Sequence, residues 1–273
     1  MDNYFFNNML SQQSAKNSLL CVGLDPEYKS LPEVVKKDKY PIFSFNKAII
    51  EATQDIACCY KPQIAHYAAL GAEKELELTI QFIKGLDIPV ILDAKRGDIG
   101  NTSEMYAREL FERYDADAVT VNPYLGRDSM EPYLSRSDKT IFILCRTSNP
   151  GSANLQNLTL EDGEKLYERV ARLAATEWNF NDNVGLVVGA TNPIELKRVR
   201  EIVGEMSLLL PGVGTQGADI EATITANGKG NTIITSSRAI LFASPNSNFS
   251  EAARAVALKT RNEINRYHQS IQA

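Results

Sequence analysis

Eight short apolar segments recur along this chain, nearly all separated by segments with a helical pattern. Short continuous apolar runs are typical of strands that are buried on both faces. Strands that alternate with helices form parallel sheets, and eight such units favour an α/β fold of the (β/α)8 TIM barrel type. The expected strands span residues 18–23, 60–66, 90–92, 118–121, 140–144, 184–188, 207–210 and 233–235.

The segments around these strands predict helices and one long loop. Residues 27–43 contain two prolines and four lysines and predict a surface loop. The stretch between the fourth and fifth strands shows no clear helix, so a doubly wound sheet remains an alternative. The length of 273 residues suits a single barrel domain spanning residues 1–273, with an N-terminal helix covering one end. Helices are expected at about 3–16, 44–57, 72–85, 101–114, 159–178, 193–203 and 249–268.

The third strand runs without a gap into a cluster of charged side chains within residues 89–107. The charges lie at the C-terminal end of a buried strand, where α/β proteins carry their active sites. Asn101 and Glu104 have the spacing of a helix N-cap and its capping-box partner. An exposed turn with solvated charges is the alternative interpretation. Because the charges follow the apolar strand without a gap, a functional site is favoured. The charged residues are Asp93, Lys95, Arg96 and Asp98.

The spacing of these charges indicates acid–base chemistry. Asp93 and Lys95 are two positions apart, so on a strand they point the same way. The carboxylate keeps the lysine protonated, which argues against a Schiff base and suits a proton donor. Lys61 enters a buried strand and needs a partner, which Asp93 on the adjacent strand could supply. His66, which closes that strand, is interpreted as an ordinary strand-end histidine.

The loops after the seventh and eighth strands have the composition of a phosphate site. Glycines at 212, 214 and 217 allow backbone N–H groups to approach an anion closely, and Gln216 can donate to it. Arg238 supplies a planar, permanently charged fork. The alternative is a flexible turn with an interface arginine. Because barrels of this type commonly bind phosphate at these two loops, we expect a phosphate here.

Composition excludes several other classes of protein. The formal net charge of −5 gives no sign of nucleic-acid binding, and no apolar run is long enough to cross a membrane. The N-terminus has no signal-peptide core. Four cysteines without CxxC spacing predict buried reduced thiols in a cytoplasmic protein and argue against metal ligation.

Residues 93–102, DAKRGDIGNT, resemble the DxKxxDIGNT signature of the orotidine 5′-phosphate decarboxylase family. From Leu19 to the last helix, the order of motifs is similar to that of the family's longer bacterial-type (type 2) subgroup. Related sugar-phosphate decarboxylases and aldolases share DxKxxD, and the added IGNT is more specific. The resemblance implies cofactor-free and metal-free conversion of orotidine 5′-phosphate (OMP) into UMP and CO2 in de novo pyrimidine biosynthesis.

The resemblance also implies roles for single residues. Lys95 would be the proton donor, Asp93 its orienting carboxylate, and Lys61 the link between the acidic groups and the sugar. Asp25, at the end of the first strand, would contact the ribose. The remaining substrate contacts would come from Gln216 and Arg238 to the phosphate and from Thr147 or Ser148 to the base or the carboxylate. The alternative for Thr147 and Ser148 is an ordinary turn without a role in binding.

The family forms homodimers with shared sites, so the resemblance implies that Asp98, a catalytic residue, and Thr102 reach the substrate of the partner subunit. The alternative is that both act within their own subunit or only cap a helix. Two other functions remain open. One is a Mg²⁺-dependent sugar-phosphate enzyme of the same barrel type, and the other is a silent barrel that binds a nucleotide as a sensor.

Overall fold

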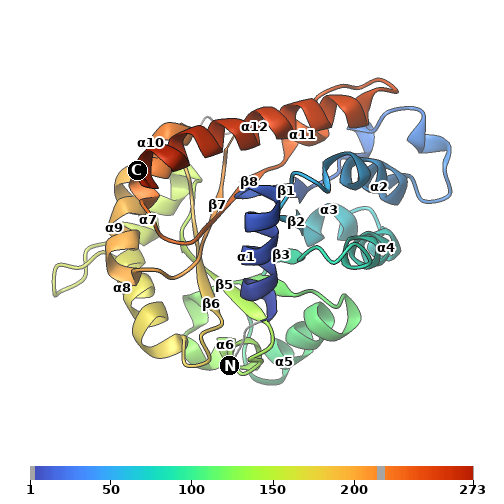
Figure 1. Ribbon diagram of the computed structural model, residues 1–273. Helices are drawn as coiled ribbons and strands as arrows, with labels where there is room; N and C mark the ends of the chain where they lie inside the picture. The colour runs from blue at the N-terminus through green and yellow to red at the C-terminus, as the bar shows by residue number, and fades with distance from the viewer. Residues whose placement is uncertain (1–3, 214–218, 273) are drawn as a thin grey trace.

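The computed structural model describes residues 4–213 and 219–272, and its strands form one eight-stranded parallel sheet (Figure 1). Neighbouring strands follow the order β2-β1-β8-β7-β6-β5-β4-β3. All seven pairings between neighbouring strands in this order are parallel, as expected for strands that alternate with helices. The strands are β1 Leu20–Leu24, β2 Cys59–Pro62, β3 Ile91–Arg96, β4 Ala118–Val121, β5 Thr140–Arg146, β6 Val184–Val188, β7 Leu208–Pro211 and β8 Thr232–Ser236.

The two end strands of this order, β2 and β3, meet and close the ring. Tyr60 pairs with Val90 and Gln63 with Asp93 through isolated parallel bridges. The backbone N–H of Tyr60 also donates to the carbonyl of Pro89 at 3.1 Å. The sheet is therefore a barrel, which confirms the predicted (β/α)8 fold and rules out the doubly wound alternative.

Helices surround the strands, and the long C-terminal helix packs across α10, α2 and β1 (Figure 1, red). The stretch between β4 and β5, where no clear helix was expected, contains a 3-10 turn at Pro123–Leu125 and a helix that includes Pro132. The α-helices are α1 Tyr4–Lys16, α2 Pro41–Thr53, α3 Ile64–Ala68, α4 Glu73–Lys84, α5 Gly100–Arg108, α6 Arg127–Leu134, α7 Ala153–Gln156, α8 Leu166–Leu173, α9 Pro193–Val203, α10 Ile220–Asn227, α11 Arg238–Leu241 and α12 Phe249–Gln272.

Helix α1 covers the N-terminal end of the barrel (Figure 1, dark blue). Its Phe5 and Met9 are buried in a cluster with side chains from the strands. The rings of Phe5 and Phe142 meet edge to face, with centroids 6.0 Å apart. A second, larger core fills the space between strands and outer helices. Apolar side chains therefore fill the barrel interior at this end.

Several predicted boundaries were wrong, including the end of the third strand, which continues to Arg96 instead of stopping at residue 92. The second strand ends at Pro62 instead of continuing to His66, which lies in α3 with its Nδ1 3.1 Å from the carbonyl of Pro26. Helix α2 starts at Pro41, inside the expected loop, because proline fits the first helical turn; two 3-10 turns occupy part of the rest of that loop. Helix α8 begins at Leu166 and continues as a π turn, whereas the segment before it forms an antiparallel bridge.

Candidate active site

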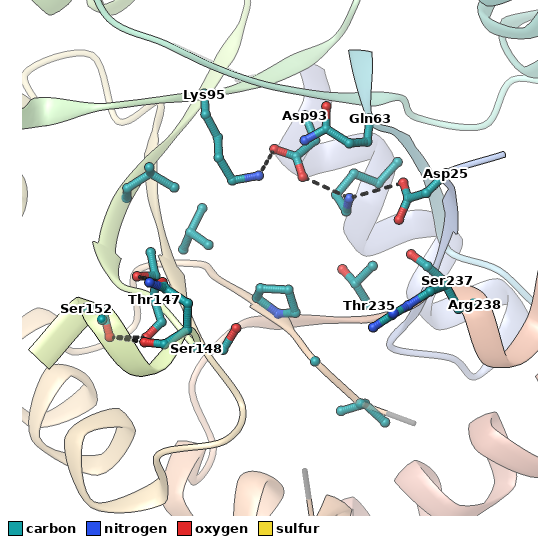
Figure 2. A pocket seen from close by; sticks show the side chains of 18 of the residues that line it. Asp25, Gln63, Asp93, Lys95, Thr147, Ser148, Ser152, Thr235, Ser237 and Arg238 are labelled. Atoms are coloured by element: carbon teal, nitrogen blue, oxygen red, sulfur yellow. Dashed lines mark hydrogen bonds and ion pairs between the residues drawn. The ribbon is translucent and has the colours of Figure 1, made fainter. Parts of the chain in front are cut away.

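A cavity of about 610 Å³ opens at the C-terminal ends of the strands (Figure 2). Carboxylates and lysines line one side, and a loop after β5 lines another. The polar residues and prolines or glycines that line it are Asp25, Lys61, Gln63, Asp93, Lys95, Thr147, Ser148, Asn149, Gly151, Ser152, Gln156, Pro211, Gly212, Thr235, Ser237 and Arg238. The cavity thus brings together residues predicted from six different strand ends.

Asp93 is the centre of the charged side of this cavity. Its side chain accepts hydrogen bonds from Lys61 Nζ at 3.0 Å and from Lys95 Nζ at 2.5 Å. The predicted ion pair between Lys61 and Asp93 is confirmed. Lys61 Nζ also lies 4.0 Å from Asp25 Oδ1, which has no hydrogen-bond partner among the described residues. The result is an alternating row of charges, Lys95, Asp93, Lys61 and Asp25, of which Figure 2 labels Lys95, Asp93 and Asp25.

Within this row, Asp93 and Lys61 hold each other ionised. Burial by itself would raise the pKa of Asp93, but the two ammonium groups and the hydrogen bond from Thr120 outweigh it and lower that pKa well below its usual range. Burial likewise opposes the charge on Lys61, yet the carboxylates of Asp93 and Asp25 raise its pKa above that of a free lysine. The site therefore presents a fixed carboxylate and fixed positive charge near neutral pH.

The backbone at Lys95 departs from a regular strand. Lys95 has φ +49°, and the pairing of β3 with β4 shifts register between Leu92 and Arg96. Left-handed backbone costs a non-glycine residue about 1 kcal/mol or more, and such strain is found at functional sites. Asp93 and Lys95 do point the same way, as predicted, but the geometry that brings them together is a bulge.

Thr120 of β4 secures this bulge and was not predicted. Its hydroxyl accepts the backbone N–H groups of Ala94 and Lys95, both at 3.0 Å, and donates to Asp93 Oδ1 at 2.8 Å. All three hydrogen-bonding positions of the hydroxyl are used. The only signal in the sequence was a threonine within the apolar run 118–121, next to the charged strand.

The loop after β5 carries the two hydroxyls predicted to meet the base. Thr147 Oγ1 donates to Asn149 Oδ1 at 2.7 Å and accepts from Gln156 Nε2 at 2.9 Å. Ser148 lines the cavity beside it (Figure 2). Gln156, which the sequence did not indicate, also lines the cavity and fixes the orientation of Thr147.

The predicted phosphate end lies on the other side of the cavity. Arg238 is exposed at the start of α11 and lines the cavity together with Ser237 and Thr235, whose Oγ1 has no hydrogen-bond partner among the described residues (Figure 2). Gly212 has φ +113°, a conformation that favours glycine. Gln216, like the glycines at 214 and 217, lies outside the described residues.

Asp98 and Thr102 do not line this cavity in their own subunit. Asp98 Oδ1 accepts the N–H of Ile99 at 2.8 Å, and Thr102 is exposed on the first turn of α5. The predicted cap was wrong: α5 starts at Gly100, so Asn101 is already inside the helix, and no side chain caps it. Gly100 itself has φ +51°.

Two broader observations concern the described part of the chain. The four cysteines are free and buried, as predicted. Within residues 4–213 and 219–272, no three His, Cys, Asp or Glu side chains are grouped so that they could hold a metal ion. The same residues include no helix that is long and apolar enough to cross a membrane.

Comparison with known proteins agrees with this geometry. Residues 18–255 match the family described as "Orotidine 5'-phosphate decarboxylase / HUMPS family". Orotidine 5′-phosphate decarboxylase of Dechloromonas aromatica is 57% identical, over 96% of this chain and 99% of the relative. The protein of the same name from Azoarcus sp. (strain BH72) is 54% identical, over 97% and 99%.

A solved structure extends the likeness to three dimensions. The structure of Leishmania donovani OMP decarboxylase superposes with a TM-score of 0.83 at 38% identity, covering 97% of this chain and 98% of that one. Fold, motif and near full-length similarity therefore coincide. The chain belongs to the orotidine 5′-phosphate decarboxylase family.

Proposed function

We propose that this cavity decarboxylates orotidine 5′-phosphate to UMP and CO2, with Lys95 as the proton donor. The enzyme class, a carboxy-lyase of pyrimidine nucleotide synthesis, follows from the family. The observation that supports the role of Lys95 is its ammonium, 2.5 Å from an Asp93 carboxylate whose other oxygen is held by Lys61. The Asp93 carboxylate thereby holds the Lys95 ammonium at the wall of the cavity.

The chemistry requires a positive charge at this place. When the bond between C6 and the carboxylate breaks, CO2 leaves and the electron pair remains on C6. No cofactor takes up that pair in this proposal, so fixed charge must stabilise it. The Lys95 ammonium supplies that charge and then transfers a proton to C6, which completes UMP. Asp93 orients Lys95. Its carboxylate also crowds the carboxylate of the substrate, which favours the loss of CO2.

The residues that line the cavity support one orientation of the nucleotide. Arg238 and the turn at Gly212 can bind the phosphate at one side. Asp25 and Lys61 lie between that side and Asp93, at the position of a ribose (Figure 2). The base then lies between Lys95 and the hydroxyls of Thr147 and Ser148. Phosphate contacts far from C6 can supply binding energy for the chemical step.

The assay is the loss of OMP absorbance in the ultraviolet, in buffer containing EDTA. Turnover under these conditions is expected, and it would separate this function from a Mg²⁺-dependent sugar-phosphate enzyme and from a silent nucleotide sensor. Lys95→Ala should lower turnover at least about a thousandfold, because the acid that protonates C6 is gone. Circular dichroism should show the fold unchanged. Near-normal turnover of the variant would remove Lys95 from the mechanism.

We further propose a homodimer in which Asp98 and Thr102 reach the substrate of the partner. Both lie beyond the cavity of their own subunit, on the chain that leaves the rim after β3. Exposed apolar side chains surround that rim: Ile99, Met105, Tyr124 and Leu125, of which Tyr124 is 73% exposed. An apolar rim around polar residues is suited to a two-fold interface.

Mixing of inactive subunits tests the shared site. A heterodimer of Lys95→Ala and Asp98→Ala subunits places both defects in one site and leaves the other site native. Activity should therefore return when tagged subunits exchange. Demonstrated exchange without recovered activity would mean that Asp98 serves its own subunit.

Three further assignments, of the subgroup, the domain organisation and the location, complete the proposal. We infer that the chain is of the longer bacterial type (type 2), supported by bacterial relatives that it covers almost completely. We infer that the 273 residues function as one barrel domain. A cytoplasmic location is supported by four buried free thiols and by a nucleotide substrate.

A further inference from the structure

A buried guanidinium lies behind the loop of residues 147–156, which forms one wall of the cavity. Arg146, the last residue of β5, is 4% exposed and does not line the cavity itself. Its Nη1 donates to the carbonyl of Thr147 at 2.8 Å, to Ser152 Oγ, and to Gln156 Oε1 at 3.4 Å. One nitrogen therefore binds the beginning, middle and end of the loop.

The other side of the guanidinium is attached to α9. Arg146 Nη2 donates to Glu195 Oε1 at 3.4 Å, and Glu195 is the third residue of that helix. A planar fork fixes the direction of each hydrogen bond, which a lysine ammonium does not do. Arg146 thus fixes the loop relative to the barrel strand that carries it and to the next helix.

The loop has little freedom to move elsewhere. Gln156 Oε1 accepts the N–H of Thr147 at 2.8 Å, which ties the two ends of the loop together. At Gly189, the residue after β6, an added Cβ would lie 2.8 Å from the backbone nitrogen of Ser148. The loop is therefore packed closely against the neighbouring strand, and a shift of the guanidinium would be transmitted to Thr147 and Ser148.

The geometry points to Arg146, paired with Glu195, as a positioning residue that holds the wall facing the pyrimidine base. Thr147, Ser148 and Ser152 lie on the side of the cavity away from Arg238 and Asp25 (Figure 2). This inference rests on the proposed function, because it takes the ligand to be a nucleotide with its phosphate at Arg238. Arg146 acts through the loop and touches no substrate atom.

Two ligands separate this role from a merely structural one. UMP carries the base and the phosphate, whereas ribose 5-phosphate lacks the base. In Arg146→Lys, titration calorimetry should find UMP binding weakened about tenfold and ribose 5-phosphate binding changed by less than about twofold, because only the base contacts are displaced. If the native chain fails to bind UMP, the proposed function fails, which is a different outcome from equal binding losses in the variant.

Arg200 provides a matched control. It is a partly buried arginine at the other end of α9, where its guanidinium donates to the carbonyls of Gly204, Met206 and Asn231. Arg200→Lys should lower stability in a similar way while leaving the ratio of the two affinities unchanged.

A second variant covers the possibility that Arg146→Lys does not fold. Glu195→Gln keeps the arginine but removes its counter-ion, and it should weaken UMP binding about threefold with ribose 5-phosphate again unaffected. Equal losses for both ligands, or no loss of UMP binding in a folded variant, would overturn the positioning role.

Discussion

Replacement of Asp93 by asparagine tests most directly whether the charges of the active site stabilise the fold. Asparagine keeps the shape of the side chain but removes the charge that faces two ammonium groups. Breaking a buried ion pair by removing one partner costs about 3–5 kcal/mol. The Lys95 side chain is 42% exposed and can turn to water, whereas Lys61 stays buried with only Asp25, 4.0 Å away. We therefore expect the lower end of this range, about 3 kcal/mol of unfolding free energy.

The unfolding free energy lost in Asp93→Asn should depend on pH in a defined direction. Asp93 has a lowered pKa in the folded state, so its contribution is present above the unfolded carboxyl pKa of 3.8 and is lost in acid as pH falls through the folded value. Lys61 has a raised pKa, so its contribution is present below 10.5 and is lost as pH rises through the folded value. The difference between native chain and variant should therefore be largest between these limits.

Urea unfolding followed by the fluorescence of the single tryptophan, Trp178, measures this difference. Asp55→Asn is a suitable control, because Asp55 pairs with Arg254 at the surface and its loss should cost about 0.5 kcal/mol. If Asp93→Asn were no less stable at pH 7 than Asp55→Asn, the view that these charges hold one another in place would be wrong.

The remaining predictions concern the bulge and the phosphate. Lys95→Gly and Lys95→Ala should both be inactive. Because Lys95 has φ +49°, urea unfolding should find the Lys95→Gly variant more stable than Lys95→Ala by about 0.5–1 kcal/mol, and the opposite order would contradict backbone strain at Lys95. Thr120→Val should cost about 1–3 kcal/mol and lower kcat, because two backbone N–H groups lose their acceptor; an unchanged kcat would contradict this. Arg238→Ala should weaken UMP binding about tenfold or more in calorimetry and leave uridine binding unchanged, because only UMP carries the charge.

The sequence by itself determined the alternation of eight strands with helices and most of the charged site. Each strand is a short apolar run, and its identity depends only on neighbouring residues. The charges at 93 and 95 directly follow the apolar run of their strand, so their place at its C-terminal end was also local information. Helix boundaries were less well predicted, as at Pro41 and Leu166, because patterns at helix ends are weak and tertiary contacts decide them.

Apart from the predicted pair of Lys61 and Asp93, only the tertiary structure decided which side chains meet. Thr120 is 27 residues from Asp93 along the chain, yet one hydroxyl of β4 holds both the carboxylate and the bulge of β3. Arg146 likewise meets Glu195 from a distant helix. A sequence pattern records the preference of each segment, whereas such contacts depend on the register and closure of the sheet. These arise only when the whole ring packs, because β2 and β3 must meet before Lys61 can reach Asp93.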